Sequence, residues 1–89
     1  MAKTKIDLQK TVGVWCRVDN WWGWLEHLQT VYKEPQILNH IGYELEKVDI
    51  IRHELMQACG FESYDDFVSF IEENNLAHWH KELNMWFIN

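Results

Sequence analysis

The sequence predicts an all-α fold, a small bundle of about four helices in a single domain, residues 1–89, with assembly as a homodimer left open. Apolar residues recur at steps of three and four over most of the chain, which is the period of one face of an α-helix. The composition is 47% hydrophobic and includes six Trp, enough apolar surface to favour a folded chain over a disordered one. Only one Pro and four Gly interrupt the pattern, so we expect few breaks.

The first segment, residues 8–32, carries a helical stripe but leaves one alternative open. Its apolar positions are Leu8, Val12, Trp15, Val18, Trp22, Leu25, Leu28 and Tyr32. Alternate residues within 11–18 are also apolar, so the alternative is one N-terminal strand at 11–18. We favour the helix because no other segment shows the alternation of a partner strand, and an unpaired strand is costly. Asp19 and Asn20 mark a candidate break or N-cap within this helix.

The second segment, residues 35–59, shows the clearest helical pattern. Its stripe consists of Ile37, Ile41, Leu45, Val48, Ile51, Leu55 and Ala58. Pro35 suits the first helical position, where its missing N–H has no intrahelical partner. Gly60 suits the position after the helix, because glycine adopts positive φ without steric cost. The sequence therefore predicts a helix over this range with both ends defined.

Two further helices are expected after Gly60. Ser63 is a candidate N-cap, and the acidic residues that follow it suit the positive end of a helix dipole. Asn74 and Asn75 form a candidate stop, because Asn tolerates the left-handed conformation. After this stop the apolar residues again step by three and four, which predicts a short fourth helix. These residues are Leu76, Trp79, Leu83 and Trp86 or Phe87.

The charge distribution predicts a basic protein partner. The net charge is −6, and acidic residues concentrate after Glu34. An acidic surface repels phosphate backbones and anionic lipid, which argues against direct binding of nucleic acid or membrane. The candidate acidic partner-binding residues are Glu44, Glu46, Asp65, Asp66, Glu72 and Glu73. Residues 1–7 are polar, with no apolar leader segment, so we expect a cytoplasmic protein.

Three Trp within four residues form the most unusual feature of the sequence. At 100° per residue, Trp22 lies on the main stripe, Trp21 at its margin and Trp24 outside it, near Arg17. Trp buries a large rigid area at low entropy cost and is enriched at binding hot spots. We therefore predict that Trp21, Trp24 and Arg17 contact a partner; the alternative is that Trp24 only covers the edge of the core.

Small and polar residues follow a second line on the same helix. They are Gly13, Cys16, Asn20, Gly23 and His27, which step by three and four on the face away from the apolar stripe. Two glycines inside a helix cost roughly 1 kcal/mol each relative to Ala, so a compensating close contact is expected. A homodimer through this seam would supply the contact. The alternative is that the glycines mark helix ends or kinks.

The sequence offers no signature of an enzyme, a metal site or a cofactor. His78 and His80 are two residues apart, about 200° around a helix, and cannot share a metal there. Cys16 and Cys59 match no disulfide framework or CxxC motif, so both are expected to be reduced. No nucleophile–base pair, carboxylate pair or Gly-rich phosphate loop is recognisable.

These observations favour an interaction protein, and three hypotheses follow. The first is an inhibitor or regulator of a basic, nucleic-acid-binding protein, by analogy with phage-encoded acidic proteins that block nucleases, CRISPR complexes or polymerases. The second is a homo-oligomer whose inter-subunit aromatic pocket holds a small ligand or nucleotide. The third is a structural or assembly subunit whose functional surface is the small-residue seam.

Overall fold

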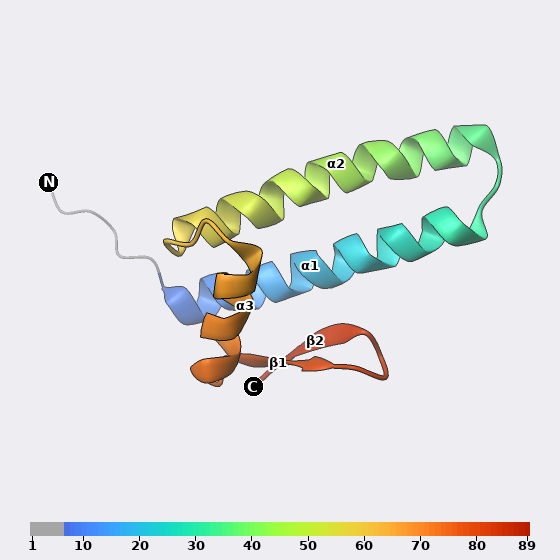
Figure 1. Ribbon diagram of the computed structural model, residues 1–89. Helices are drawn as coiled ribbons and strands as arrows, with labels where there is room; N and C mark the ends of the chain where they lie inside the picture. Colours follow the sequence, from blue (N-terminus) through green and yellow to red (C-terminus); the bar gives the residue numbers. More distant parts are fainter. Residues whose placement is uncertain (1–6) are drawn as a thin grey trace, which may run out of the picture.

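The computed structural model describes residues 7–89 and shows three helices followed by a β-hairpin (Figure 1). The elements are α1 (Leu8–Val31), α2 (Pro35–Ala58), α3 (Tyr64–Glu73), β1 (Ala77–His80) and β2 (Met85–Ile88). Helices α1 and α2 lie antiparallel and side by side. Helix α3 crosses the first half of α1, and the hairpin lies along the side of α1 that faces away from α2.

The predicted helix boundaries are confirmed for the first three helices. Ser63 begins α3, and its hydroxyl accepts a hydrogen bond from the Asp66 amide at 3.4 Å. Pro35 occupies the first turn of α2. Gly60, after the end of α2, has φ +92°, the conformation for which glycine was expected there. The candidate break at Asp19 and Asn20 is wrong, since α1 runs through both residues without interruption.

The predicted fourth helix is wrong: the segment after Asn75 forms the antiparallel hairpin β1–β2. Asn75 and Asn84 both adopt positive φ, 55° and 57°, which turns the chain before each strand. Trp79 pairs with Trp86 across the strands, and their rings meet edge to face at 5.5 Å. Of the apolar residues expected to face the core, Trp86 is buried, whereas Trp79 and Leu83 are 39% and 58% exposed. The steps of three and four did not distinguish two short strands from one short helix.

The alternative strand at 11–18 is also wrong, because those residues belong to α1. Val12, Trp15 and Cys16 are buried, while Val14 and Arg17 are exposed, the pattern of a helix with one covered side. The reason given against this strand was incomplete, since the chain does contain two strands. These strands pair with each other.

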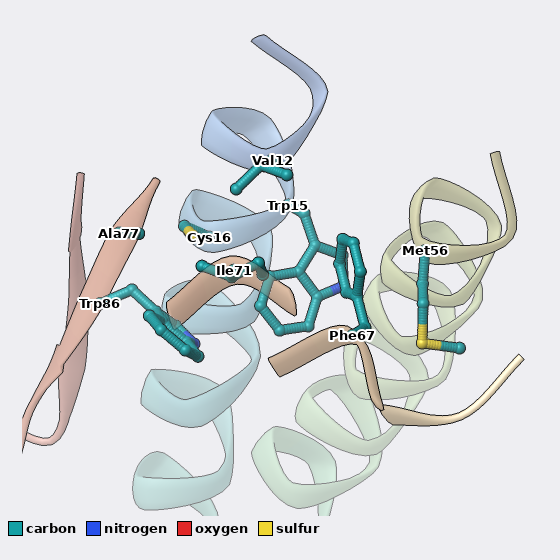
Figure 2. Packing of buried hydrophobic residues seen from close by; sticks show 8 residues of the cluster. All are labelled: Val12, Trp15, Cys16, Met56, Phe67, Ile71, Ala77 and Trp86. Atoms are coloured by element: carbon teal, nitrogen blue, oxygen red, sulfur yellow. The ribbon is translucent and has the colours of Figure 1, made fainter. Parts of the chain in front are cut away.

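The buried residues form two clusters. The larger one joins all the elements, and Figure 2 shows its members: Val12, Trp15, Cys16, Met56, Phe67, Ile71, Ala77 and Trp86. The smaller one lies between α1 and α2 alone and consists of Leu25, Ile41 and Val48. We call the first region the closed end and the second the open end.

Trp15 lies at the centre of the closed end. Its indole meets Phe67 edge on at 4.9 Å and Trp86 at 5.9 Å, so one side chain of α1 contacts α3 and β2 together. Such edge-to-face contacts add to the area that each ring buries. Within residues 7–89, no helix combines the length and apolar character needed to cross a bilayer.

Candidate functional site

A pocket of about 460 Å³ opens between the second half of α1 and the tip of the hairpin. Its lining residues are Asn20, Gly23, Trp24, His27, Leu83, Asn84 and Met85. Its volume lies within the roughly 300–1,000 Å³ of sites that hold small molecules or partner side chains. We call it the α1–hairpin pocket.

Asn20 fixes the hairpin beside α1 and thereby forms one wall of the pocket. Its side-chain amide donates to the carbonyl of Trp86 at 3.0 Å and accepts from the amide of Trp86 at 2.7 Å. The side chain therefore replaces a neighbouring strand at the outer edge of β2, which would otherwise leave both backbone groups unpaired.

Asp19 adds a buried link between the hairpin and both long helices. Its carboxylate accepts from the indole N–H of Trp86 at 2.9 Å and from the guanidinium of Arg52 at 2.6 Å. Arg52 also contacts Asp49 at 2.8 Å and lies 3.9 Å from the ring centroid of Trp22. A buried carboxylate is tolerated when its oxygens are hydrogen-bonded to a cation and a donor, as here. The network thus fixes the position of β2 relative to α1 and α2.

The hairpin tip forms the opposite wall of the pocket. The backbone amide of Asn84 donates to the carbonyl of His80 at 2.7 Å, and that of Leu83 donates to Nδ1 of His80 at 3.2 Å. These bonds hold the four-residue connection closed and leave the Leu83 side chain 58% exposed at the rim. Leu83 and Met85 make this wall apolar.

Trp24 and His27 form the wall contributed by α1. Their ring centroids lie 5.7 Å apart, and the two rings are tilted by 33° relative to each other. Trp24 remains 52% exposed, so its indole offers a free surface to a group that enters the pocket. A Cβ atom at Gly23 would meet no atom within 4 Å, so this glycine leaves the floor between the two walls open.

The sequence-predicted residues separate into two groups in space. Asn20, Gly23 and His27 of the predicted seam share the α1–hairpin pocket with Trp24. The first part of the seam is covered by the same chain: Cys16 is buried in the core, and a Cβ atom at Gly13 would lie 3.5 Å from Ile88. The β1–β2 hairpin of the same chain thus covers this part of the seam, an arrangement that was not expected from the sequence.

The other predicted contact residues lie outside the pocket. Trp21 is 48% exposed, and a step of three residues turns it about 60° around α1 from Trp24. Arg17 lines a second, more open pocket of about 530 Å³ beside Ile88 of β2, together with Lys10 and Val14. These three residues step by four and three along α1 and so share one exposed side of the helix, but of them only Trp24 lines the α1–hairpin pocket.

The acidic residues follow α2 and α3. Glu44 and Glu46 lie on α2, Asp65 and Asp66 in the first turn of α3, and Glu72 and Glu73 in its last turn. On these two helices the cations are Lys47, 3.9 Å from Glu44, and Arg52, which is engaged by two carboxylates. The side of the molecule formed by α2 and α3 is therefore negative, whereas the pocket is aromatic and polar.

Neither thiol is activated. Burial, with a smaller contribution from the charge of Asp19, raises the pKa of Cys16 to about 12. Burial also raises the pKa of Cys59. Both thiols are therefore protonated near neutral pH, which disfavours nucleophilic attack. Among residues 7–89, no three His, Cys, Asp or Glu side chains gather closely enough to hold a metal ion.

The sequence analysis missed Asp19, Arg52 and Trp86 as a structural unit. One signal was present: Asp and Asn inside a helix compete with its backbone and are unfavourable there without a tertiary partner. Asp19 and Asn20 both have such a partner in Trp86. The two adjacent residues were interpreted as a candidate helix break or N-cap, whereas in the structure they hold β2 against α1.

Comparison of the chain with protein-family models, with curated proteins and with solved structures found no match.

Proposed function

We propose that this protein is a small interaction protein that inhibits or regulates a basic protein by binding it at the α1–hairpin pocket. Trp24 carries this proposal. Trp15 and Trp86 are buried to within a few per cent, yet Trp24 presents half of its surface to solvent beside an open hollow. A rigid aromatic side chain at the wall of a pocket is a common anchor for a partner group.

The negative side formed by α2 and α3 supports a basic partner. Opposite charge raises the rate of encounter, and separate apolar or aromatic anchors slow dissociation. A cationic side chain of the partner also suits the face of Trp24, because a cation over an indole is attracted by the ring quadrupole. In this proposal the negative side formed by α2 and α3 accelerates the encounter with the partner, and Trp24 slows its dissociation.

A photo-reactive amino acid introduced at Leu83 tests this proposal in cells of the natural host. Leu83 is 58% exposed at the pocket rim, and the matched control position is Tyr43 on α2, which is 59% exposed. We expect a crosslink to one basic protein from position 83 and not from position 43. Crosslinks that are equal at the two positions contradict binding at the pocket.

Measurements of affinity and association rate with the captured protein then distinguish the contribution of the pocket from that of the negative charge. Trp24→Ala should weaken the affinity at least about 30-fold, the effect of a hot spot of about 2 kcal/mol. Gly23→Leu should weaken it by filling the pocket, while Gly42→Leu on α2 should not; neither glycine has an atom within 4 Å of an added Cβ. The association rate should fall steeply as the Debye length shrinks from about 30 Å to about 3 Å with added salt. Affinity unchanged by Trp24→Ala and by Gly23→Leu would refute the proposed site.

A small planar ligand is the second candidate occupant. The pocket volume and its Trp24–His27 wall favour it, and this pocket is formed by one chain. Quenching of Trp fluorescence by a nucleotide or other planar ligand, lost in Gly23→Leu and kept in Gly42→Leu, would favour this candidate.

A further inference from the structure

One face of the α1–α2 layer carries apolar side chains that nothing in the described chain covers. On α1, the core residue Cys16 faces α3 and the hairpin. Val14 and Trp21 lie about 160° and 140° around the helix from Cys16 and are 42% and 48% exposed. They are seven residues apart and therefore share one side of α1.

Helix α2 extends the same face. Its core residue Met56 contacts the closed end, and Ile51 lies about 140° around the helix from it and is 49% exposed. Ile37, two heptads before Ile51, is 38% exposed on the same side. We call the surface formed by Val14, Trp21, Ile37 and Ile51 the back face; it lies opposite to α3, and near Val14 it borders Ile88 of β2.

The size of the back face suits a stable dimer. Both helices have 24 residues and are therefore about 36 Å long. At a helix spacing of about 9 Å, the two together present a face of about 36 by 18 Å, or about 650 Å². A standard stable interface removes about 800 Å² of accessible surface per partner, so one such face is of the required order.

The charges around the back face suit a second copy of the chain better than a basic partner. Lys10 and Arg17 border it on α1, one turn from Val14. On α2, Glu44 lies within it, one heptad from both Ile37 and Ile51 and 3.9 Å from Lys47, and Lys47 and Glu54 border it. Both signs are present, so two identical rims related by a two-fold axis can pair them. The four carboxylates of α3 lie on the opposite side of the α1–α2 layer. Two copies can therefore approach without opposing their acidic surfaces.

We propose that two copies of this chain associate through their back faces, so that two α1–α2 layers form a four-helix arrangement with the hairpins outside. Trp21 and Ile51 are the central apolar contacts. Trp24 and the α1–hairpin pocket stay on the outer surface of each copy. The dimer is independent of the proposed function, because it forms from the purified chain alone and leaves the pocket open.

Sedimentation velocity over a concentration series tests the dimer. The wild-type chain should sediment at twice its 10.8 kDa mass at tens of micromolar. Trp21→Lys and Ile51→Glu should each weaken the dimer at least about 100-fold, because each places unpaired charge inside an apolar interface. A wild-type chain that is monomeric at these concentrations overturns the proposal.

Neighbouring residues supply matched controls with nearly equal exposure. Tyr43 is 59% and Ile50 is 58% exposed, and both lie on the side of α2 opposite to its core residues Ile41 and Val48, so Tyr43→Lys and Ile50→Glu should remain dimeric. Far-UV circular dichroism confirms folding of all four variants, since each changes a side chain that is exposed in the single chain. Persistence of the dimer in both Trp21→Lys and Ile51→Glu, or its loss in the controls as well, overturns the proposed face.

Discussion

The closed and open ends of the molecule share the same two helices but differ in what covers them. At the closed end, α3 and the hairpin add a second layer, and Trp15, Phe67 and Ile71 are at most 1% exposed. At the open end α1 and α2 have only each other, and Ile41 and Val48 keep 5% and 6% exposure. The apolar stripes of α1 and α2 are therefore covered by three elements at the closed end, whereas at the open end they contact only each other.

This difference shows that a periodic stripe defines which side of a helix is apolar but not how deeply it is buried. Ile37 and Ile51 both belong to the stripe expected for α2, yet they are 38% and 49% exposed. Depth of burial comes from a third element, and at the open end the described chain provides none. The aromatic pocket lies beside this uncovered half, whereas the back face also extends along the closed end, where Val14 neighbours Trp15 on α1.

The largest expected effect compares the two ends by the same substitution. Ile71→Ala at the closed end should lower the free energy of unfolding by about 4 kcal/mol, whereas Ile41→Ala at the open end should lower it by about 2 kcal/mol. The packing around Ile71 is fully enclosed and cannot close around the lost atoms, whereas the packing around Ile41 is less enclosed and can relax. Urea denaturation measures both values, and equal losses would contradict the distinction between the ends.

The next effect concerns the attachment of the hairpin. Asn20→Ala should lower the free energy of unfolding by about 2 kcal/mol, because it leaves the amide and carbonyl of Trp86 without partners. Asn39→Ala on the exposed surface of α2 is the control and should change stability by less than about 0.5 kcal/mol. Hydrogen exchange at the Trp86 amide should accelerate in the first variant only; unchanged exchange there would argue against the observed bonding.

The smallest expected effect is a loss of folding stability at alkaline pH, which follows from the buried thiol of Cys16. Its pKa is about 12 in the folded chain and about 9 when unfolded, so the stability it confers is complete below pH 9 and is lost as pH rises toward 12. Tyr64, whose pKa burial and the nearby Asp19 raise to about 12, adds a loss of the same sign above its ordinary value of 10.

Unfolding free energies at about pH 8 and about pH 10.5 test this dependence. The wild-type chain should lose stability between them, and Cys16→Ala should lose less. Cys59→Ala is the control, since Cys59 is only partly buried. A thiol reagent should also modify Cys59 before Cys16 in the folded chain; the opposite order would contradict the packing of the closed end.

Local signals in the sequence were sufficient for the helices and insufficient for the hairpin. Pro35, Gly60 and Ser63 act through the backbone of their own segment, so their roles can be predicted without knowledge of the fold. The hairpin depends on Trp86 docking against α1, and no pattern within residues 76–89 contains that information. The run Met85–Ile88 after Asn84 is rich in strand-forming residues and was the available signal.

The candidate site, too, could be predicted only where its residues depend on their own segment of the sequence. Trp24, Gly23 and His27 were singled out because they did not fit the core stripe, and they do line the pocket. Leu83 and Met85 could not be assigned to it, because their position depends on the hairpin. The sequence therefore indicated the half of the site that α1 contributes.

The link between Asp19 and Trp86 also has a consequence for the order of folding, because the two residues are 67 positions apart. Helices α1 and α2 are neighbours in the chain and can pair through short loop closure, which is fast. In that pair Asp19 already has Arg52 as a partner, whereas Asn20, Trp15 and the second oxygen of Asp19 lack the contacts that Trp86 of the final strand supplies. The densest part of the protein is thus completed by its final strand, and until that strand docks, the helical pair exposes a carboxylate and an indole that are buried in the native fold.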